Sequence, residues 1–331
     1  MSGSYAVRRQ ALDGAGAGVE VVRLVDAARN VELAILPSVG NTAFEWKVRG
    51  KNFLYFPYPG PAEFVRQPRF CAVPFLAPWA NRIAGDGFWA NGKRYLFNAE
   101  LGNLRRDGNK NPIHGLLSTS NLWKVVEARD DDRSAWVTSR LEFWKYPDLM
   151  AQFPFPHTLT MTYRLRDGVV EVETAIENHG TEPMPVGIGY HPYFRLHEVA
   201  RDEWHVHLAA RDHMALDAQL IPTGESKRVE FADPLSLSTG QLDDVFGNLI
   251  RDSDGLARFY VEGGHERVTV TYGPKYTIAV VYAPKGQDFI CFEPMSAITN
   301  GFNLAHAGLY KELQSVAPGG SWKESFWLTA S

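Results

Sequence analysis

The sequence has little cysteine: only Cys71 and Cys291 occur in 331 residues. Both lie among apolar neighbours, which is typical of buried thiols, and two cysteines form no disulfide framework. A chain of this length buries a large core without such bridges. These observations exclude a small scaffold held together by disulfides.

Long apolar runs are missing as well. No stretch approaches the roughly 20 apolar residues that a membrane-spanning helix needs. Residues 1–9 lack the apolar segment of a secretory signal. We therefore expect a cytoplasmic protein without a membrane partner.

Clusters of charge of one sign are also rare. The chain carries 34 Lys and Arg against 38 Asp and Glu, a net charge of −4. A nucleic-acid-binding domain usually shows a clustered basic face, and the densest charge block here is the acidic run 130–132, which is typical of a solvated turn. We expect no nucleic-acid partner.

Helical periodicity is almost absent, and short β-branched and aromatic runs recur between Gly, Pro, Asn and Asp instead. Asn91-Gly92 and Asp167-Gly168 are strong hairpin signals. No linker or composition shift divides the chain, so we predict an all-β fold, a large antiparallel β-sandwich forming one domain over residues 1–331. The clearest predicted strands are 136–143, 159–165, 169–176, 267–272 and 276–282.

Several familiar catalytic motifs are missing. The segment from Gly87 to Arg94 matches most of a phosphate-binding loop, but Arg94 replaces the Ser or Thr that holds magnesium, and Asn91-Gly92 predicts a hairpin. There is no Gly-x-Ser-x-Gly elbow and no His-Glu-x-x-His helix. His205 and His207 have metal-ligand spacing, but without an obvious third ligand they are interpreted as surface residues.

Ionisable and amide residues flanked by Gly, Pro and aromatics interrupt the strand pattern in several segments. A single His or Asp in such a place is usually a core or turn residue. Glu293 follows the apolar run 289–292, and a buried carboxylate without a partner is costly. It is therefore either one half of an ion pair, with Arg82 as the candidate partner, or a tuned acid or base. The full set is Asn81-Arg82, His114, His191, Asp243-Asp244 and Glu293.

Taken in order, these segments resemble the aldose 1-epimerase (galactose mutarotase) family. The motifs are Asn-Arg-Ile-Ala-Gly at 81–85, Ile-His-Gly at 113–115, His-Pro-Tyr-Phe at 191–194, Leu-Asp-Asp-Val-Phe at 242–246 and Phe-Glu-Pro at 292–294. The resemblance extends from about Val39 to the C-terminus. It implies an antiparallel β-sandwich with a sugar cleft on one concave sheet and a small-molecule aldose as substrate.

The resemblance also implies roles for single residues. Glu293 corresponds to the catalytic base, and His191 and His114 to the two active-site histidines. Among the substrate-binding residues, Arg82 and Asp243 correspond to hydroxyl contacts and Asn81 to the neighbour of Arg82 in its motif.

Two segments depart from the family pattern. Gly273 stands before Pro274 where galactose mutarotases usually carry a substrate-binding glutamine, and residues 296–300 differ from the usual Pro-Asp-Ala pattern. The sequence therefore leaves open which sugar is the substrate, and it leaves the oligomeric state open too.

Interconversion of anomers needs a base at the anomeric hydroxyl and an acid at the ring oxygen, and no metal or redox cofactor. We expect Glu293 as the base and protonated His191 as the acid, with His114 assisting. A glycosidase would usually need two carboxylates about 5–10 Å apart. Two alternatives remain: a hexose-6-phosphate 1-epimerase, for which Arg66, Arg69, Arg105 and Arg106 are available, and a non-catalytic carbohydrate-binding protein.

Overall fold

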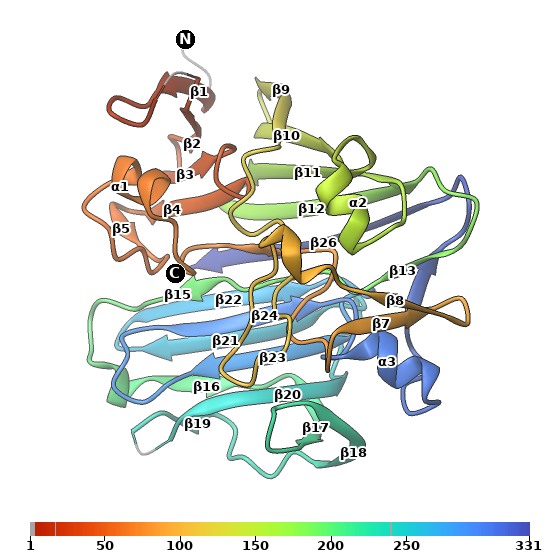
Figure 1. Ribbon diagram of the computed structural model, residues 1–331. Coiled ribbons are helices and arrows are strands. Elements are labelled where there is room, and N and C mark those ends of the chain that lie inside the picture. The colour runs from red at the N-terminus through yellow and green to blue at the C-terminus, as the bar shows by residue number, and fades with distance from the viewer. Residues whose placement is uncertain (1–3, 17, 239) are drawn as a thin grey trace.

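The computed structural model describes residues 4–16, 18–238 and 240–331. Antiparallel β-strands dominate it, as predicted, and every pairing between the strands named below is antiparallel. Figure 1 shows the strands stacked into sheets, with short helices at their margins.

Two large sheets form the sandwich. The nine-stranded sheet has the order β19 (Leu235–Ser236), β16 (His205–His207), β21 (Ala257–Gly263), β22 (Glu266–Tyr272), β26 (Ser321–Ala330), β12 (Val169–Asn178), β11 (His157–Arg166), β10 (Ala135–Glu142) and β9 (Lys124–Asp130). The second sheet has the order β18 (Pro222–Arg228), β17 (Ala210–Leu216), β20 (Leu242–Leu249), β23 (Ile278–Ala283), β24 (Ile290–Met295), β14 (Gly189–Tyr190) and β6 (Phe75–Leu76), and β15 (Tyr193–Phe194) also pairs with β24.

Smaller elements surround this sandwich. A five-stranded sheet consists of β1 (Tyr5–Ala11), β2 (Glu20–Asp26), β3 (Val31–Leu36), β4 (Thr42–Val48) and β5 (Lys51–Asn52). Two strand pairs lie outside these sheets, β7 (Gly87–Ala90) with β8 (Lys93–Leu96) and β13 (Met184–Val186) with β25 (Gln314–Val316). The described residues also form three α-helices, α1 (Pro61–Arg66), α2 (Pro147–Gln152) and α3 (Gly301–His306), and three short 3-10 helices.

The predicted hairpins form as expected. Asn91 and Gly92 both have positive φ between β7 and β8, and so do Asp167 and Gly168 between β11 and β12. Two positive φ values in a two-residue loop are what a type I′ turn requires. The phosphate-loop interpretation therefore fails at 87–94, where strand, turn and strand replace the required strand, loop and helix.

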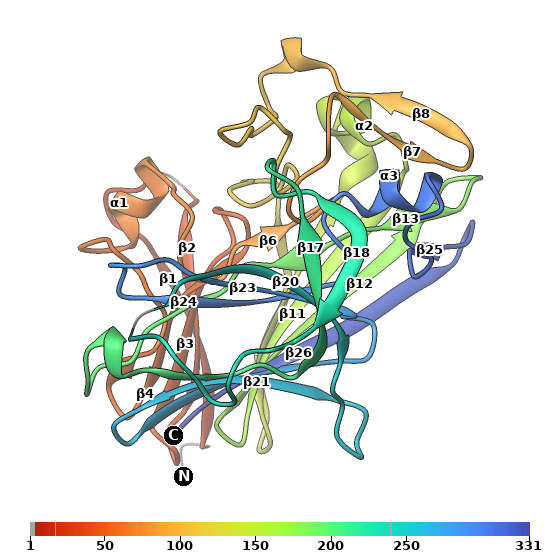
Figure 2. The ribbon, with the colours of Figure 1, turned by 90° about the horizontal axis from the view of Figure 1, so that it is seen from below.

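Alternation of side chains explains the two layers. In β12, Val170, Val172 and Ile176 are buried, whereas Glu171 and Glu173 are only partly buried. The buried faces of both sheets form one cluster that reaches from Tyr5 to Leu328. Figure 2 shows β20, β23 and β24 as a layer against β21 and β26, with β7, β8 and α3 on the opposite side of that layer. No helix in the described ranges is long and apolar enough to cross a membrane.

Candidate active site

Strand β24 places Glu293 on the outer face of its sheet. Phe292 points inward, where its ring lies 6.2 Å from that of Phe259 in the nine-stranded sheet. Because successive side chains in a strand point to opposite faces, Glu293 points the other way. Glu293 is nonetheless only 1% exposed, because the segments that carry His191 and His114, described below, cover this face.

Pairing across β24 brings His191 to Glu293. Gly189 pairs with Met295 and Tyr193 pairs with Cys291, so His191 lies opposite Glu293. The His191 Nε2 atom is 3.3 Å from Glu293 Oε1. The His191 ring also stacks on Tyr193, with centroids 4.6 Å apart, which fixes its orientation.

A glycine-dependent turn places His114 beside His191. The His114 N–H donates to the Asn81 carbonyl at 2.9 Å, and the two imidazole centroids are 5.4 Å apart. Gly115 follows with φ 63°, and a Cβ there would lie 2.1 Å from the Ala77 carbonyl oxygen. The predicted His-Gly pair is thus a histidine held in place by a glycine that passes against neighbouring backbone.

Arg82 has a different partner from the one expected. Its Nε donates to Asp107 Oδ2 at 2.7 Å, and its Nη1 donates to Asn81 Oδ1 at 3.0 Å. Of the two interpretations of Glu293, the ion pair with Arg82 does not form, because Asp107 pairs with the guanidinium. Sequence reasoning missed Asp107, whose Asp-Gly-Asn context resembles any turn.

The strand register distinguishes Asp243 from Asp244. Asp243 pairs with Tyr282, which pairs with Cys291, and Cys291 shares a strand face with Glu293. Asp243 therefore lies on the Glu293 face, where it is exposed. Asp244 lies on the other face, and its Oδ1 is 2.7 Å from His213 Nε2.

Burial shifts the pKa values of the central groups toward their neutral forms. It lowers the pKa of His191 to about 3 and that of His114 well below its usual range. Burial, assisted by the charge of Asp243, raises the pKa of Glu293 well above its ordinary value, and Arg82 opposes this shift. These shifts favour neutral His191 and a protonated Glu293 in the unliganded site, whereas the sequence-based expectation was a protonated His191.

Three buried polar atoms in this cluster have no hydrogen-bond partner among the described residues: His114 Nδ1, His191 Nδ1 and Glu293 Oε2. An unsatisfied buried polar group typically costs about 1–3 kcal/mol. Their convergence, next to the exposed Asp243, is suited to a ligand rich in hydroxyl groups. The half-buried rings of Phe70 and Tyr282, which sequence reasoning did not single out, adjoin the histidines with centroids 4.9 Å (Phe70 to His114) and 6.0 Å (Tyr282 to His191) apart.

Gly273 does not lie in the sheet that carries Glu293. It follows β22 in the nine-stranded sheet, and a Cβ there would lie 2.2 Å from Glu324 Oε1. A larger residue does not fit this position without rearrangement.

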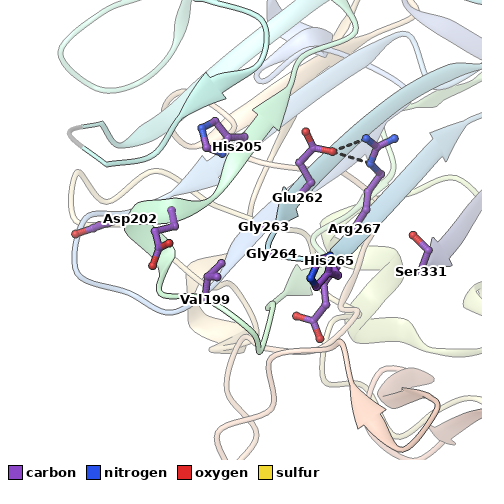
Figure 3. A pocket seen from close by; sticks show the side chains of 11 residues that line it. Val199, Asp202, His205, Glu262, Gly263, Gly264, His265, Arg267 and Ser331 are labelled. Atoms are coloured by element: carbon purple, nitrogen blue, oxygen red, sulfur yellow. Dashed lines mark hydrogen bonds and ion pairs between the residues drawn. The ribbon is translucent and has the colours of Figure 1, made fainter.

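A surface cavity of about 750 Å³ also lies away from these residues (Figure 3). It is lined mainly by charged side chains at the edge of the nine-stranded sheet, among which Glu262 and Arg267 bond each other at 2.9 Å. It contains none of the predicted site residues. Its lining offers neither the buried acid–base pair nor the aromatic rings of the Glu293 cluster, so we place the candidate active site at Glu293.

The sequence model of the aldose 1-epimerase family matches residues 23–329 of this chain. The chain belongs to the aldose 1-epimerase family. This match begins at residue 23, whereas the resemblance seen in the sequence began at about Val39.

Solved structures share the fold of this family member. A galactose mutarotase-like protein from Clostridium acetobutylicum has a TM-score of 0.86 at 22% identity, covering 99% of both chains. Galactose 1-epimerase from Lactobacillus acidophilus NCFM has a TM-score of 0.72 at 15% identity, covering 100% of this chain and 99% of its own. Among curated proteins, the uncharacterized Escherichia coli protein YihR is 25% identical over 236 residues, covering 69% of this chain and 70% of YihR.

Proposed function

We propose that this protein is an aldose 1-epimerase that interconverts the α and β anomers of an aldose at the Glu293 cluster. One observation carries the proposal: a buried carboxyl group and a buried imidazole lie 3.3 Å apart, beside a second imidazole. A positioned acid and base are what ring opening needs. The family match supports the same assignment.

The reaction proceeds with one proton held by the pair. Transfer of the Glu293 proton to His191 gives a carboxylate and an imidazolium. The carboxylate then removes the proton of the anomeric hydroxyl, the bond between C1 and the ring oxygen breaks, and the imidazolium protonates that oxygen. The products are the open-chain aldehyde, neutral Glu293 and neutral His191, which is the charge state that burial favours.

Closure reverses the transfers. After rotation about C1–C2, His191 removes the proton from the C5 hydroxyl, the oxygen attacks the other aldehyde face, and Glu293 protonates the new anomeric oxygen. The proton on His191 then returns to Glu293, which restores the starting state of the pair. In this proposal Arg82 and Asp243 hold sugar hydroxyls through charge-assisted hydrogen bonds. His114 contacts the ring-oxygen side, where its unpartnered Nδ1 is available.

The direct test is exchange between the anomeric H1 signals of equilibrated sugars, measured by NMR with and without protein. We expect faster exchange for at least one sugar in a panel of D-glucose, D-galactose, D-glucuronate and D-glucose 6-phosphate. Binding of a panel member without any acceleration would favour the non-catalytic carbohydrate-binding alternative. If no sugar of the panel is bound and none is accelerated, the proposed function is contradicted.

A further inference from the structure

Arg105 lies beside the candidate site and differs from the arginines around it. Its Cζ is 3.9 Å from the centre of the Phe70 ring, which stacks on His114. The Arg105 carbonyl accepts the N–H of Ile113 at 3.0 Å, one residue before His114. Main-chain bonding and ring stacking together hold this cation next to the histidines.

The neighbouring arginines have acidic partners. Arg82 bonds Asp107, and Arg106 lies 3.2 Å from Asp86 and also donates to the Lys110 carbonyl. Within the ranges that the structure describes, no carboxylate forms a salt bridge or hydrogen bond with the guanidinium of Arg105.

The surroundings of Arg105 leave its charge uncompensated. Partial burial lowers the pKa of Arg105, and only the Tyr193 hydroxyl opposes this. The charge of Arg105 in turn contributes to lowering the pKa of both His114 and His191, after the larger effect of burial. Arg105 nevertheless stays exposed as a residue, so a ligand can reach its guanidinium. An accessible cation without a counter-charge favours an anionic ligand.

We infer that the substrate is an anionic aldose whose acidic group binds Arg105. This inference rests on the proposed function and names its substrate class. In that mechanism the imidazoles act on the ring oxygen. In an aldohexopyranose, the exocyclic carbon nearest to this oxygen is C6, which is attached to C5. The acidic group is therefore a carboxylate or phosphate at C6, and the planar guanidinium suits bidentate binding of either.

The test compares two adjacent arginines. Arg105→Met removes the cation, and Arg106→Met, the matched control, removes an arginine that already has an acidic partner. The value of kcat/KM for anomer exchange is measured with D-glucuronate, D-glucose 6-phosphate and D-glucose. The two anionic probes distinguish a carboxylate from a phosphate at C6.

We expect the wild type to prefer one anionic sugar over D-glucose. Arg105→Met should reduce that preference roughly 10- to 100-fold, as for the loss of a charge-assisted hydrogen bond, and Arg106→Met should retain it. Arg105→Lys, which keeps the positive charge but loses the planar guanidinium, should restore part of the preference.

Three results would overturn the inference. If D-glucose is accelerated at least as well as both anionic sugars, the substrate class is wrong and the proposed function stands. If Arg105→Met lowers kcat/KM equally for anionic and neutral sugars, Arg105 does not select the charge. If no sugar is accelerated by the wild type, the proposed function fails and the inference fails with it.

Discussion

At the scale of single residues, burial decides how the Glu293–His191 pair holds its proton. An imidazole in water has a pKa near 6.5, but burial lowers the pKa of His191 to about 3 and raises that of Glu293. The residue types were predictable from the sequence, since carboxylate and imidazole stand in unusual Gly- and Pro-rich contexts. Their protonation was not, because it depends on burial and on charges that are distant in the chain, such as Asp243 for Glu293 and Arg105 for His191.

This charge distribution predicts the pH dependence of the reaction. The pair works with one transferable proton, which Glu293 carries in the resting state. It is inactivated when His191 becomes protonated while Glu293 keeps this proton, or when Glu293 loses the proton to solvent. A lowered His191 pKa moves the acid limb below about pH 4, and a raised Glu293 pKa moves the alkaline limb upward. We expect kcat/KM for exchange, corrected for the uncatalysed rate, not to fall as the pH decreases from 7 to 5, because His191 titrates below this range.

Circular dichroism at each pH serves as the control that the protein stays folded. A tenfold fall in kcat/KM between pH 7 and 5.5 in folded protein would show a histidine titrating near its ordinary pKa, and would contradict this account.

At the scale of secondary-structure elements, strand alternation was readable and register was not. The predicted ranges 136–143, 159–165 and 169–176 correspond to β10, β11 and β12. In contrast, β6, β14 and β15 contain two residues each, which is too short for any periodicity to appear. These short strands bring His191 to Glu293, so the sequence could name both residues but not show how they meet. The pairing of Arg82 with Asp107 was hidden for a similar reason, because it joins two loops.

The turn after His114 offers a test at this scale. Gly115→Ala introduces a Cβ 2.1 Å from the Ala77 carbonyl oxygen at a residue with φ 63°. A positive φ costs a non-glycine residue about 1–2 kcal/mol, and a clash with backbone adds roughly 1–3 kcal/mol. We expect a loss of about 3 kcal/mol in the free energy of unfolding, measured by urea titration.

Gly92→Ala provides the matched control. Gly92 also has a positive φ, 73°, but its Cβ would meet no atom within 4 Å. That variant should lose only about 1 kcal/mol. Equal losses in the two variants would show that the contact with Ala77 does not constrain the His114 turn.

At the scale of the whole molecule, two sheets bury one continuous core and leave one sheet's outer face for the site. The all-β architecture followed from composition and turn spacing, and the family followed from five short motifs in order. The organisation as a single domain over 1–331 stays a prediction, which the core cluster from Tyr5 to Leu328 supports. The sugar was beyond sequence reasoning, because selectivity depends on which charged groups lack partners after folding.

In the proposed function, activity depends on the carboxyl group of Glu293, and Glu293→Gln tests this most directly. Because burial raises the pKa of Glu293 and favours its neutral form, an uncharged glutamine should preserve folding and sugar binding. We expect the anomer exchange rate, measured by NMR at saturating sugar, to fall about 10²–10⁴-fold, with the dissociation constant changed by less than about threefold. Glu262→Gln, which removes a carboxylate from the cavity of Figure 3, should retain the wild-type rate. A Glu293→Gln protein that exchanges anomers as fast as the wild type would contradict the account.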